Sequence, residues 1–536
     1  MARTGFFHKV QQLMRVALHC ARTDEPAAEA LQRLRAQAEK TARQPRRRVL
    51  SAAAGLGVAS ALPLPLRAAP GAGGRDVAVV GAGLAGLHAA GLLAGKGARA
   101  QVFEAGERVG GRVWSLRGVF PGQVAERGAE LIDTTHSTLR GLAGAYGLTL
   151  ESYAANKLPG EEAFYFFGRH WTEAQVVEEF RAFVPALKDD LSRLSNGPTA
   201  LAYNETDRRL DFTPLSDYLV QRGAGALIRA VLDVAYTIEF GREINRQSAL
   251  AMLFFIATNK RQAFTPFGVF SDERFHIVEG NDAVAQGMAA GLPQPVRLGH
   301  RLLRVARQSD GRVRLSFATA GGTVETVHDA VVLTLPAPMM RQVEFSVSVA
   351  LPAGNRFAID QFDYGTSSKM MIGFNGRPWF ERSNSNGASY SDLANHQSTW
   401  ETNPSLARAG SRGVLTDFSG GARGARLDPA RLQTEATAFL ADLDLVYPGS
   451  SGLARRDSRG RVQAHLENWS RLPLFQGAYS NNQPGYFTTI EGLYARPAGN
   501  VYFAGEHTDS FYSYQGFMEG ALLSGARAAD EVLRGF

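Results

Sequence analysis

Three glycines and one glutamate have the spacing of a dinucleotide-binding turn. Gly81, Gly83 and Gly86 form a G-x-G-x-x-G pattern, and Glu104 follows 23 positions after Gly81. The first glycine permits a tight turn, the second lets the backbone approach a diphosphate, and the third lets a helix pack closely on a strand. A carboxylate at this distance can accept hydrogen bonds from ribose hydroxyls. The pattern predicts a dinucleotide site that includes Gly81, Ala82, Gly83, Gly86 and Glu104.

The elements around these residues supply the context that such a turn needs. Residues 77–80 are an apolar run suited to a buried parallel strand, residues 87–93 have a helical pattern, and residues 99–103 form a second apolar run. The helix would begin at the glycine turn, where its unpaired N–H groups and partial positive charge favour phosphate. A strand, a glycine turn, a helix and a second strand are therefore expected in this order.

A second glycine pair indicates which dinucleotide binds. Arg108 and Arg112 flank Gly110 and Gly111. This segment resembles the one that follows the second strand in flavin-dependent amine oxidases, where the glycines and the second arginine approach the FAD diphosphate. A guanidinium there would neutralise phosphate charge. A plain turn with surface arginines is the alternative.

Residues 124–132 resemble the family's next segment, a strand that passes beside the flavin, but with one departure. Members that act on L-amino acids commonly place an arginine just after this glycine, where it pairs with the substrate carboxylate. This chain has Ala129 and Glu130 after Gly128. Glu130 could attract a second ammonium group of a substrate, or it could be a strand acid bonded to backbone or ribose.

Two later segments resemble the family's return to the cofactor-binding domain. Residues 276–282 match the re-entry, and residues 330–336 form another buried-strand pattern that ends in a turn. Between them lies a segment that resembles a further strand of the family. The resemblance implies that the backbone of this strand, around Val305, contacts the adenine side of FAD. The resemblance thus implies a chain that passes repeatedly between two domains.

Lys369 stands in a strand-like segment beside apolar residues. It would share a face with Met371, so its ammonium group is either a guard on an edge strand or a functional group. The resemblance implies the second role, in which the lysine holds a water near flavin N5 and assists O2 activation.

The last part of the chain resembles the family's substrate and flavin segments. The resemblance implies that Trp469 packs near the flavin, and that Tyr479 and Phe517 form the two walls of an aromatic cage around the amine. It also places Gly505 and Glu506 near the diphosphate and ribitol, and the backbone of Phe517 and Met518 at the pyrimidine edge. A helix that begins there would stabilise the reduced ring.

Together the segments imply an α/β fold: a Rossmann-like FAD-binding domain interwoven with an α+β substrate domain. The implied reaction is FAD-dependent oxidation of a primary or secondary amine to an imine, with O2 reduced to hydrogen peroxide. An L-amino-acid oxidase, a desaturase or isomerase of the same fold, and a non-enzymatic flavoprotein that binds a partner remain alternatives. A homodimer is allowed by the sequence but not required.

The expected domain boundaries follow these segments. Residues 1–75 are a leader, residues 76–150, 275–340 and 461–536 build the FAD-binding domain, and residues 151–274 and 341–460 build the substrate domain. Helices are expected in the substrate domain at residues 173–194, 214–222, 224–236 and 247–257. Its aromatic residues 164–167 and Trp171 could line a channel, although core packing is commoner.

Composition restricts the chemistry further. The net charge of +7 comes from residues 1–75, which hold 13 Lys/Arg against 4 Asp/Glu, so no nucleic-acid groove is inferred. The single cysteine, Cys20, excludes a disulfide, a zinc–cysteine cluster and a flavin–cysteine link in residues 76–536. We therefore expect no metal and a non-covalently bound FAD.

The leader contains Arg46, Arg47 and Arg48 before a mildly apolar stretch that ends at Leu66. This pattern is typical of a twin-arginine export signal, which would place the protein in the periplasm or outside the cell. Pro63 and Pro65 interrupt the stretch, so no stable membrane span is expected. The alternative is a basic linker after two helix-like segments, residues 6–18 and 27–42, in a cytoplasmic protein.

Overall fold

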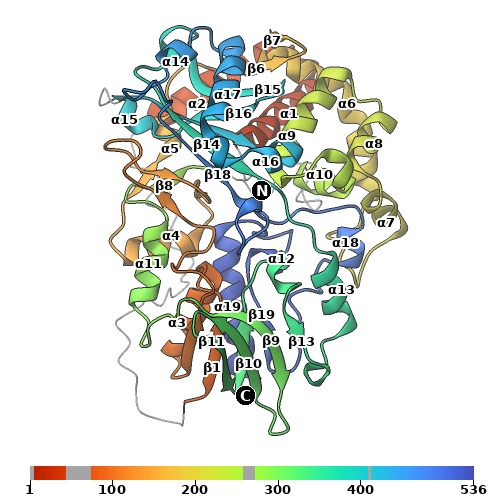
Figure 1. The fold of residues 1–536 in the computed structure, drawn as a ribbon. Coiled ribbons are helices and arrows are strands. Elements are labelled where there is room, and N and C mark those ends of the chain that lie inside the picture. Colours follow the sequence, from red (N-terminus) through yellow and green to blue (C-terminus); the bar gives the residue numbers. More distant parts are fainter. Residues whose placement is uncertain (1–4, 44–73, 257–271, 409–411, 536) are drawn as a thin grey trace.

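The computed structural model describes residues 5–43, 74–256, 272–408 and 412–535. The twin-arginine stretch lies outside these ranges. Within them, no helix combines the length and the apolar character needed to cross a membrane. The described residues form three main sheets, and Figure 1 shows two of these at one end of the molecule and the third at the other.

A four-stranded parallel sheet forms around the glycine turn. Its order is β19-β12-β1-β2, and the strands come from three distant parts of the chain. Val77 and Val79 pack toward the helices on one face, whereas Ala78 and Val80 pack toward the other, as strand alternation requires. The bounds are β1 (Asp76–Val80), β2 (Arg99–Phe103), β12 (Ala330–Leu333) and β19 (Val501–Phe503).

The two faces of this sheet are covered differently. Helices α3 (Leu84–Gly95), α11 (Asp282–Ala290) and α19 (Met518–Arg534) pack on one side. On the other lies a second sheet of order β11-β10-β9-β13, and the rings of Phe103 and Phe317 stack 4.6 Å apart between the two. The second sheet consists of β9 (Arg301–Arg307), β10 (Val313–Thr319), β11 (Gly322–His328) and β13 (Glu344–Phe345).

The third sheet has seven strands in the order β18-β14-β17-β16-β15-β6-β7. Only the β15–β6 pair is parallel. Strand β18, the last one of this sheet in chain order, lies beyond residue 460, where the sequence predicted the cofactor-binding domain, and it pairs with β14. The strands are β6 (Glu161–Phe166), β7 (Arg169–Trp171), β14 (Ser368–Gly373), β15 (Ser385–Leu393), β16 (His396–Glu401), β17 (Val414–Ser419) and β18 (Ala464–Asn468).

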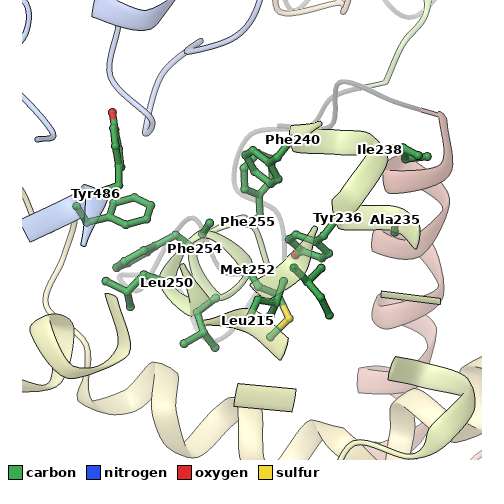
Figure 2. Packing of buried hydrophobic residues seen from close by; sticks show 14 of the residues in the cluster. Leu215, Ala235, Tyr236, Ile238, Phe240, Leu250, Met252, Phe254, Phe255 and Tyr486 are labelled. Carbon is green, nitrogen blue, oxygen red and sulfur yellow. The ribbon is translucent and has the colours of Figure 1, made fainter. Parts of the chain in front are cut away.

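Helices cover this sheet and form a large apolar core with it. Figure 2 shows part of that core, where Tyr236, Phe254 and Tyr486 come from separate helices. Phe164 and Phe166 are fully buried here, so they belong to the core. The four helices expected from the sequence are α6 (Glu173–Arg193), α8 (Leu215–Gln221), α9 (Ala226–Phe240) and α10 (Ala249–Ile256).

The two N-terminal helices belong to the same core. They form α1 (Gly5–Thr23) and α2 (Ala27–Arg43), which pack against α6 and α9 (Figure 1). Phe6 is 1% exposed and stacks on Tyr390 at 3.8 Å, and Lys9 forms a 2.6 Å ion pair with Glu173. Helices α1 and α2 are therefore built into the core that also contains α6 and α9.

Shorter elements connect these parts. The strands are β3 (Ser115–Leu116), β4 (Ala125–Glu126), β5 (Leu150–Ser152) and β8 (Phe275–Ile277). The remaining α-helices are α4 (Ser137–Ala145), α5 (Tyr153–Asn156), α7 (Glu205–Asp211), α12 (Ala337–Met340), α13 (Ala353–Gln361), α14 (Pro378–Glu381), α15 (Pro404–Arg408), α16 (Gly421–Arg426), α17 (Leu432–Val446) and α18 (Tyr486–Thr489). The 3-10 helices are η2 (Ile244–Arg246), η3 (Val347–Val349), η4 (Pro429–Arg431), η5 (Ser451–Leu453), η6 (Trp469–Arg471) and η7 (Glu506–Thr508).

Candidate active site and cofactor cavity

One cavity runs from the glycine turn to the seven-stranded sheet. The sequence-predicted residues that line it come from both glycine turns, from the end of β2, from β14 and from the segments after residue 468. They are Gly81, Gly83, Glu104, Gly111, Arg112, Lys369, Trp469, Tyr479, Gly505, Glu506, Phe517 and Met518. Ala82, Gly86, Arg108 and Val305 are not among the lining residues.

The turn between β1 and α3 leaves room at one glycine and none at the other two. A Cβ on Gly86 would lie 1.9 Å from the Gly81 carbonyl oxygen, and a Cβ on Gly81 would lie 2.3 Å from Thr334 Oγ1. By contrast, no atom lies within 4 Å of a Cβ on Gly83, which is the N-cap of α3 and offers no side-chain cap. The start of α3 therefore opens toward the cavity with the helix-end charge that favours phosphate.

Glu104 lies at the end of β2 and links the turn to the cavity. Its Oε2 accepts a 2.8 Å hydrogen bond from the Ala82 N–H, and its Oε1 accepts one of 2.8 Å from the Gly106 N–H. Each carboxylate oxygen has a further lone pair that can accept from a ribose hydroxyl. Ala82 contributes by orienting this carboxylate, since its own side chain is fully buried.

The second glycine pair forms a turn against the first. The Gly110 N–H donates to the Ala82 carbonyl at 2.8 Å, and Gly111 has a φ of 58° that favours glycine. Arg108 braces this turn, because its guanidinium donates to the carbonyl oxygens of Val109, Val113 and Gly111. Its guanidinium also lies 4.0 Å from the Trp114 ring centroid. The structure thus gives Arg108 a supporting position behind the cavity wall.

Arg112 and Glu506 form an ion pair inside the cavity. Arg112 Nη1 donates to Glu506 Oε1 and to the Ala478 carbonyl, each at 2.8 Å, and Ser480 Oγ donates to Glu506 Oε2 at 2.6 Å. Burial opposes the charge on Glu506, but the attraction of Arg112, together with His507 and the hydrogen bond from Ser480, outweighs it and lowers the pKa of Glu506 to about 2. Because Glu506 offsets the charge of Arg112, the helix ends supply much of the positive potential for a diphosphate.

The start of α19 is the second helix end at the cavity. Phe517 is its N-cap in extended conformation, the helix has no side-chain cap, and Met518 and Ala521 line the cavity. A Cβ on Gly525 would lie 2.3 Å from the Ala85 carbonyl oxygen, so α19 and α3 are in close contact. Two uncapped helix N-termini therefore open on one cavity, an arrangement that fits a diphosphate and the electron-rich edge of a reduced flavin.

Lys369 lies in the interior strand β14 between β17 and β18, which excludes the role of an edge-strand guard. Its Nζ is within 2.5 Å of Glu130 Oε2, 2.8 Å of the Gly128 carbonyl and 3.4 Å of the Glu126 carbonyl. The indole N–H of Trp400 donates to Glu130 Oε1 at 3.0 Å. All three ammonium hydrogens thus have an acceptor, and the long contact to Glu126 is the one that a water can replace most easily.

The aromatic residues predicted near the flavin and the substrate all line the cavity. Trp469 is held by a 2.9 Å hydrogen bond from its indole N–H to the Arg127 carbonyl. The Tyr479 hydroxyl donates to the Ile238 carbonyl at 3.1 Å, and the ring of Phe517 lies edge-on to His136 at 5.4 Å.

The residues of β9 that line the cavity differ from Val305, the residue that the sequence predicted on this strand. Val305 is fully buried between β10 and β13, and its carbonyl accepts from the Ser346 N–H. Arg301 and Leu302 of the same strand line the cavity instead.

Sequence reasoning also missed Asp133, Glu273 and Trp400, which line the cavity near Glu130. Asp133 directly follows the apolar pair Leu131 and Ile132, a position that could have drawn attention. Glu273 and Trp400 belong to no motif, so only the tertiary structure brings them to the site.

Comparison with known proteins agrees with this geometry. The family of flavin containing amine oxidoreductases matches residues 84–533. An L-amino-acid oxidase of Bungarus fasciatus is 25% identical over 86% of this chain and 87% of its own length. One of Mus musculus is 26% identical over 85% of this chain and 70% of its own length.

Solved structures show the same fold at lower identity. Putrescine oxidase bound to putrescine matches with a TM-score of 0.69 and 19% identity, over 86% of this chain and 99% of that one. Cyclohexylamine oxidase from Brevibacterium oxydans matches with a TM-score of 0.70 and 20% identity over the same shares. With the family match, the paired helix ends and the glycine cradle, we conclude that the chain is an enzyme that belongs to the flavin containing amine oxidoreductases.

Proposed function

We propose that this enzyme holds FAD non-covalently and oxidises a small amine that carries no carboxylate. The amine would lose two electrons and two hydrogens to give an imine, which water hydrolyses to a carbonyl compound, and O2 would be reduced to hydrogen peroxide. The observation that carries this proposal is the acidic lining near Phe517 and Lys369, which consists of Glu130, Asp133 and Glu273.

The positions of the lining arginines support the same conclusion. Among the cavity-lining residues that the structure describes, the arginines are Arg112, Arg127 and Arg301. Arg112 is paired with Glu506 and Arg127 with Glu467, while Arg301 lies on β9 beside Leu302. At the substrate end, a substrate carboxylate would therefore meet the acids Asp133 and Glu273 rather than an unpaired guanidinium of these lining residues.

The chain's residues have distinct roles in this proposal. Gly83, Glu104 and the start of α3 would hold the diphosphate and ribose, and the start of α19 would face the flavin; bound FAD supplies the two-electron acceptor. Tyr479 and Phe517 would flank the amine and exclude water, which favours its uncharged, reactive form. Lys369, whose charge Glu130 compensates, would place a water or O2 rather than abstract a proton.

An L-amino-acid oxidase is the second candidate, because relatives with that name match most of this chain. Anaerobic mixing of the FAD-loaded enzyme with monoamines, diamines and L-amino acids tests both candidates, with flavin bleaching as the readout. Bleaching by amines, followed by hydrogen peroxide release in air, supports the proposal. Bleaching by L-amino acids alone contradicts it.

The position of α1 supports a proposal about location. Cleavage after the apolar stretch that ends at Leu66 would separate α1 and α2 from the rest of the chain, although Phe6 and Leu13 lie in its core. We therefore favour the linker interpretation of residues 46–66 over a cleaved twin-arginine signal. N-terminal sequencing of the mature protein tests this: a start before Gly5 supports it, and a start between residues 67 and 76 contradicts it.

A further inference from the structure

Glu273 is a buried carboxylate that lines the cavity without a full set of partners. It is 9% exposed, and within the described part of the chain its Oε1 has no hydrogen-bond partner. Its backbone has a φ of 41°, a conformation that L-residues other than glycine rarely adopt. Such strained, unsatisfied positions persist where the surrounding structure requires them, often at binding sites.

A chain of contacts links Glu273 to the predicted cage. Its backbone N–H donates to Asp133 Oδ1 at 2.8 Å, and Asp133 Oδ2 lies 3.4 Å from His136 Nε2. The His136 ring is in turn 5.4 Å from the Phe517 ring. Glu273 therefore belongs to the substrate end of the cavity rather than to the adenosine end.

The surroundings of Glu273 are short of positive charge. Burial and the negative charges of Asp133, Glu239 and Glu130 raise the pKa of Glu273 well above its usual value. Lys157 acts in the opposite direction but is paired with Glu162 at 2.7 Å, and Lys369 is paired with Glu130. The carboxylate thus needs a proton or an incoming cation before it can remain buried at low cost.

We propose that Glu273 binds the second, protonated amino group of the substrate, so that α,ω-diamines are the preferred substrate class. This inference rests on the proposed amine oxidase function and adds a subsite to it. Glu130 is the residue for which the sequence suggested such a contact, but its negative charge is already compensated by the ammonium group of Lys369. In the part of the chain that the structure describes, no three acidic, histidine or cysteine side chains are grouped as metal ligands, which favours an ammonium over a metal ion as the cation.

The test compares putrescine with n-butylamine, which have the same carbon chain and differ by one amino group. Anaerobic flavin reduction by each amine is measured with the FAD-loaded wild-type enzyme and with Glu273→Gln. The amide keeps the volume of the side chain and removes its charge. Glu344→Gln, a change at an exposed carboxylate paired with Arg304, is the matched control.

We expect the wild type to prefer putrescine, measured as the rate of reduction over the dissociation constant, by at least about tenfold, the range of a buried charge pair. Glu273→Gln should bring this preference close to one by losing activity on putrescine alone, and Glu344→Gln should keep it. Flavin absorbance and melting temperature show whether the variants are folded.

Two results would overturn the inference, and they are distinguishable. Equal reduction of the wild-type flavin by both amines, or an unchanged preference in folded Glu273→Gln, removes the subsite but leaves the amine oxidase function intact. A flavin that no amine reduces removes the proposed function and the subsite together. If Glu273→Gln does not retain FAD, Glu273→Asp, which keeps the charge and shortens the side chain, should shift the preference toward longer diamines, and no shift counts against the subsite.

Discussion

The half around the glycine turn, which we propose binds the cofactor, and the half around the seven-stranded sheet, which we propose binds the substrate, differ in what determines their residues. Around Gly81 and Gly86 the space is so small that no Cβ fits, so residue types and spacing are dictated by backbone contact. Around Lys369 and Glu273, side chains from β14 and from residues far apart in sequence meet only in the folded chain. In the first half, local backbone contacts determine the residue types, whereas in the second half the tertiary structure does. Sequence motifs can therefore describe the first half but not the second.

The largest effect is expected from a substitution in the glycine turn, where the structure leaves no space for a side chain. In Gly86→Ala the new Cβ would lie 1.9 Å from the Gly81 carbonyl oxygen, so the turn cannot keep its geometry. We expect loss of FAD incorporation, measured by the ratio of flavin to protein absorbance after purification. Gly91→Ala in the same helix is the control, because nothing lies within 4 Å of its Cβ. A variant at Gly86 that binds FAD normally would contradict the account of this turn.

The next effect concerns the N-terminal helix of the substrate half. Phe6→Ala removes a ring that is 1% exposed and stacked on Tyr390, and such truncations cost about 3–5 kcal/mol. We expect a clear drop in the urea midpoint of unfolding. Phe167→Ala, at a 55% exposed ring, should change it little. Equal stability of both variants would show that α1 is not part of the core.

A smaller effect should separate the two half-reactions. Lys369→Met combined with Glu130→Gln removes the ion pair without leaving a buried charge. We expect reoxidation of the reduced flavin by O2 to slow by about 100-fold, the range for loss of one positioned charge. Anaerobic reduction should change much less, and stopped-flow absorbance measures both steps. Equal slowing of both steps would contradict the proposed role of Lys369.

The smallest effect is a pH dependence beside that ion pair. Burial raises the pKa of Glu126 to about 8, so the folded protein keeps this carboxyl protonated while the unfolded chain releases the proton near pH 4.5. The raised pKa therefore lowers stability progressively as the pH rises from about 4.5 to 8. In Glu126→Gln this loss is absent, so the melting temperature relative to wild type should increase with pH across that window. A constant difference would mean that Glu126 is ionised in the folded protein.

The sequence was sufficient to predict the structure wherever the backbone geometry allows only one type of residue. The β1–α3–β2 unit, the glycine turns and the carboxylate of Glu104 all lie where their spacing predicted, and so do helices α6, α8, α9 and α10. The α/β fold and the family followed from the same segments. The backbone contact of Val305 with the adenine side stays a prediction, while Arg301 and Leu302 of the same strand line the cavity.

The parts of the site and the fold that the sequence did not predict depend on tertiary contacts, which local sequence patterns do not encode. Nothing near Glu130 in the sequence indicates that Lys369 and Trp400 will occupy its oxygens, and nothing near Glu273 indicates that it will face the cavity. The packing of α1 against α6 was equally hidden, because an amphipathic helix does not reveal its partner.

The most direct test of the central claim compares substrates that differ only by one carboxylate. The rate of anaerobic flavin reduction is measured for matched pairs such as cadaverine with L-lysine and phenethylamine with L-phenylalanine. Because carboxylates line the substrate end of the cavity, we predict that the amine reduces the flavin faster in each pair, by at least about tenfold. Faster reduction by the amino acids would contradict the account.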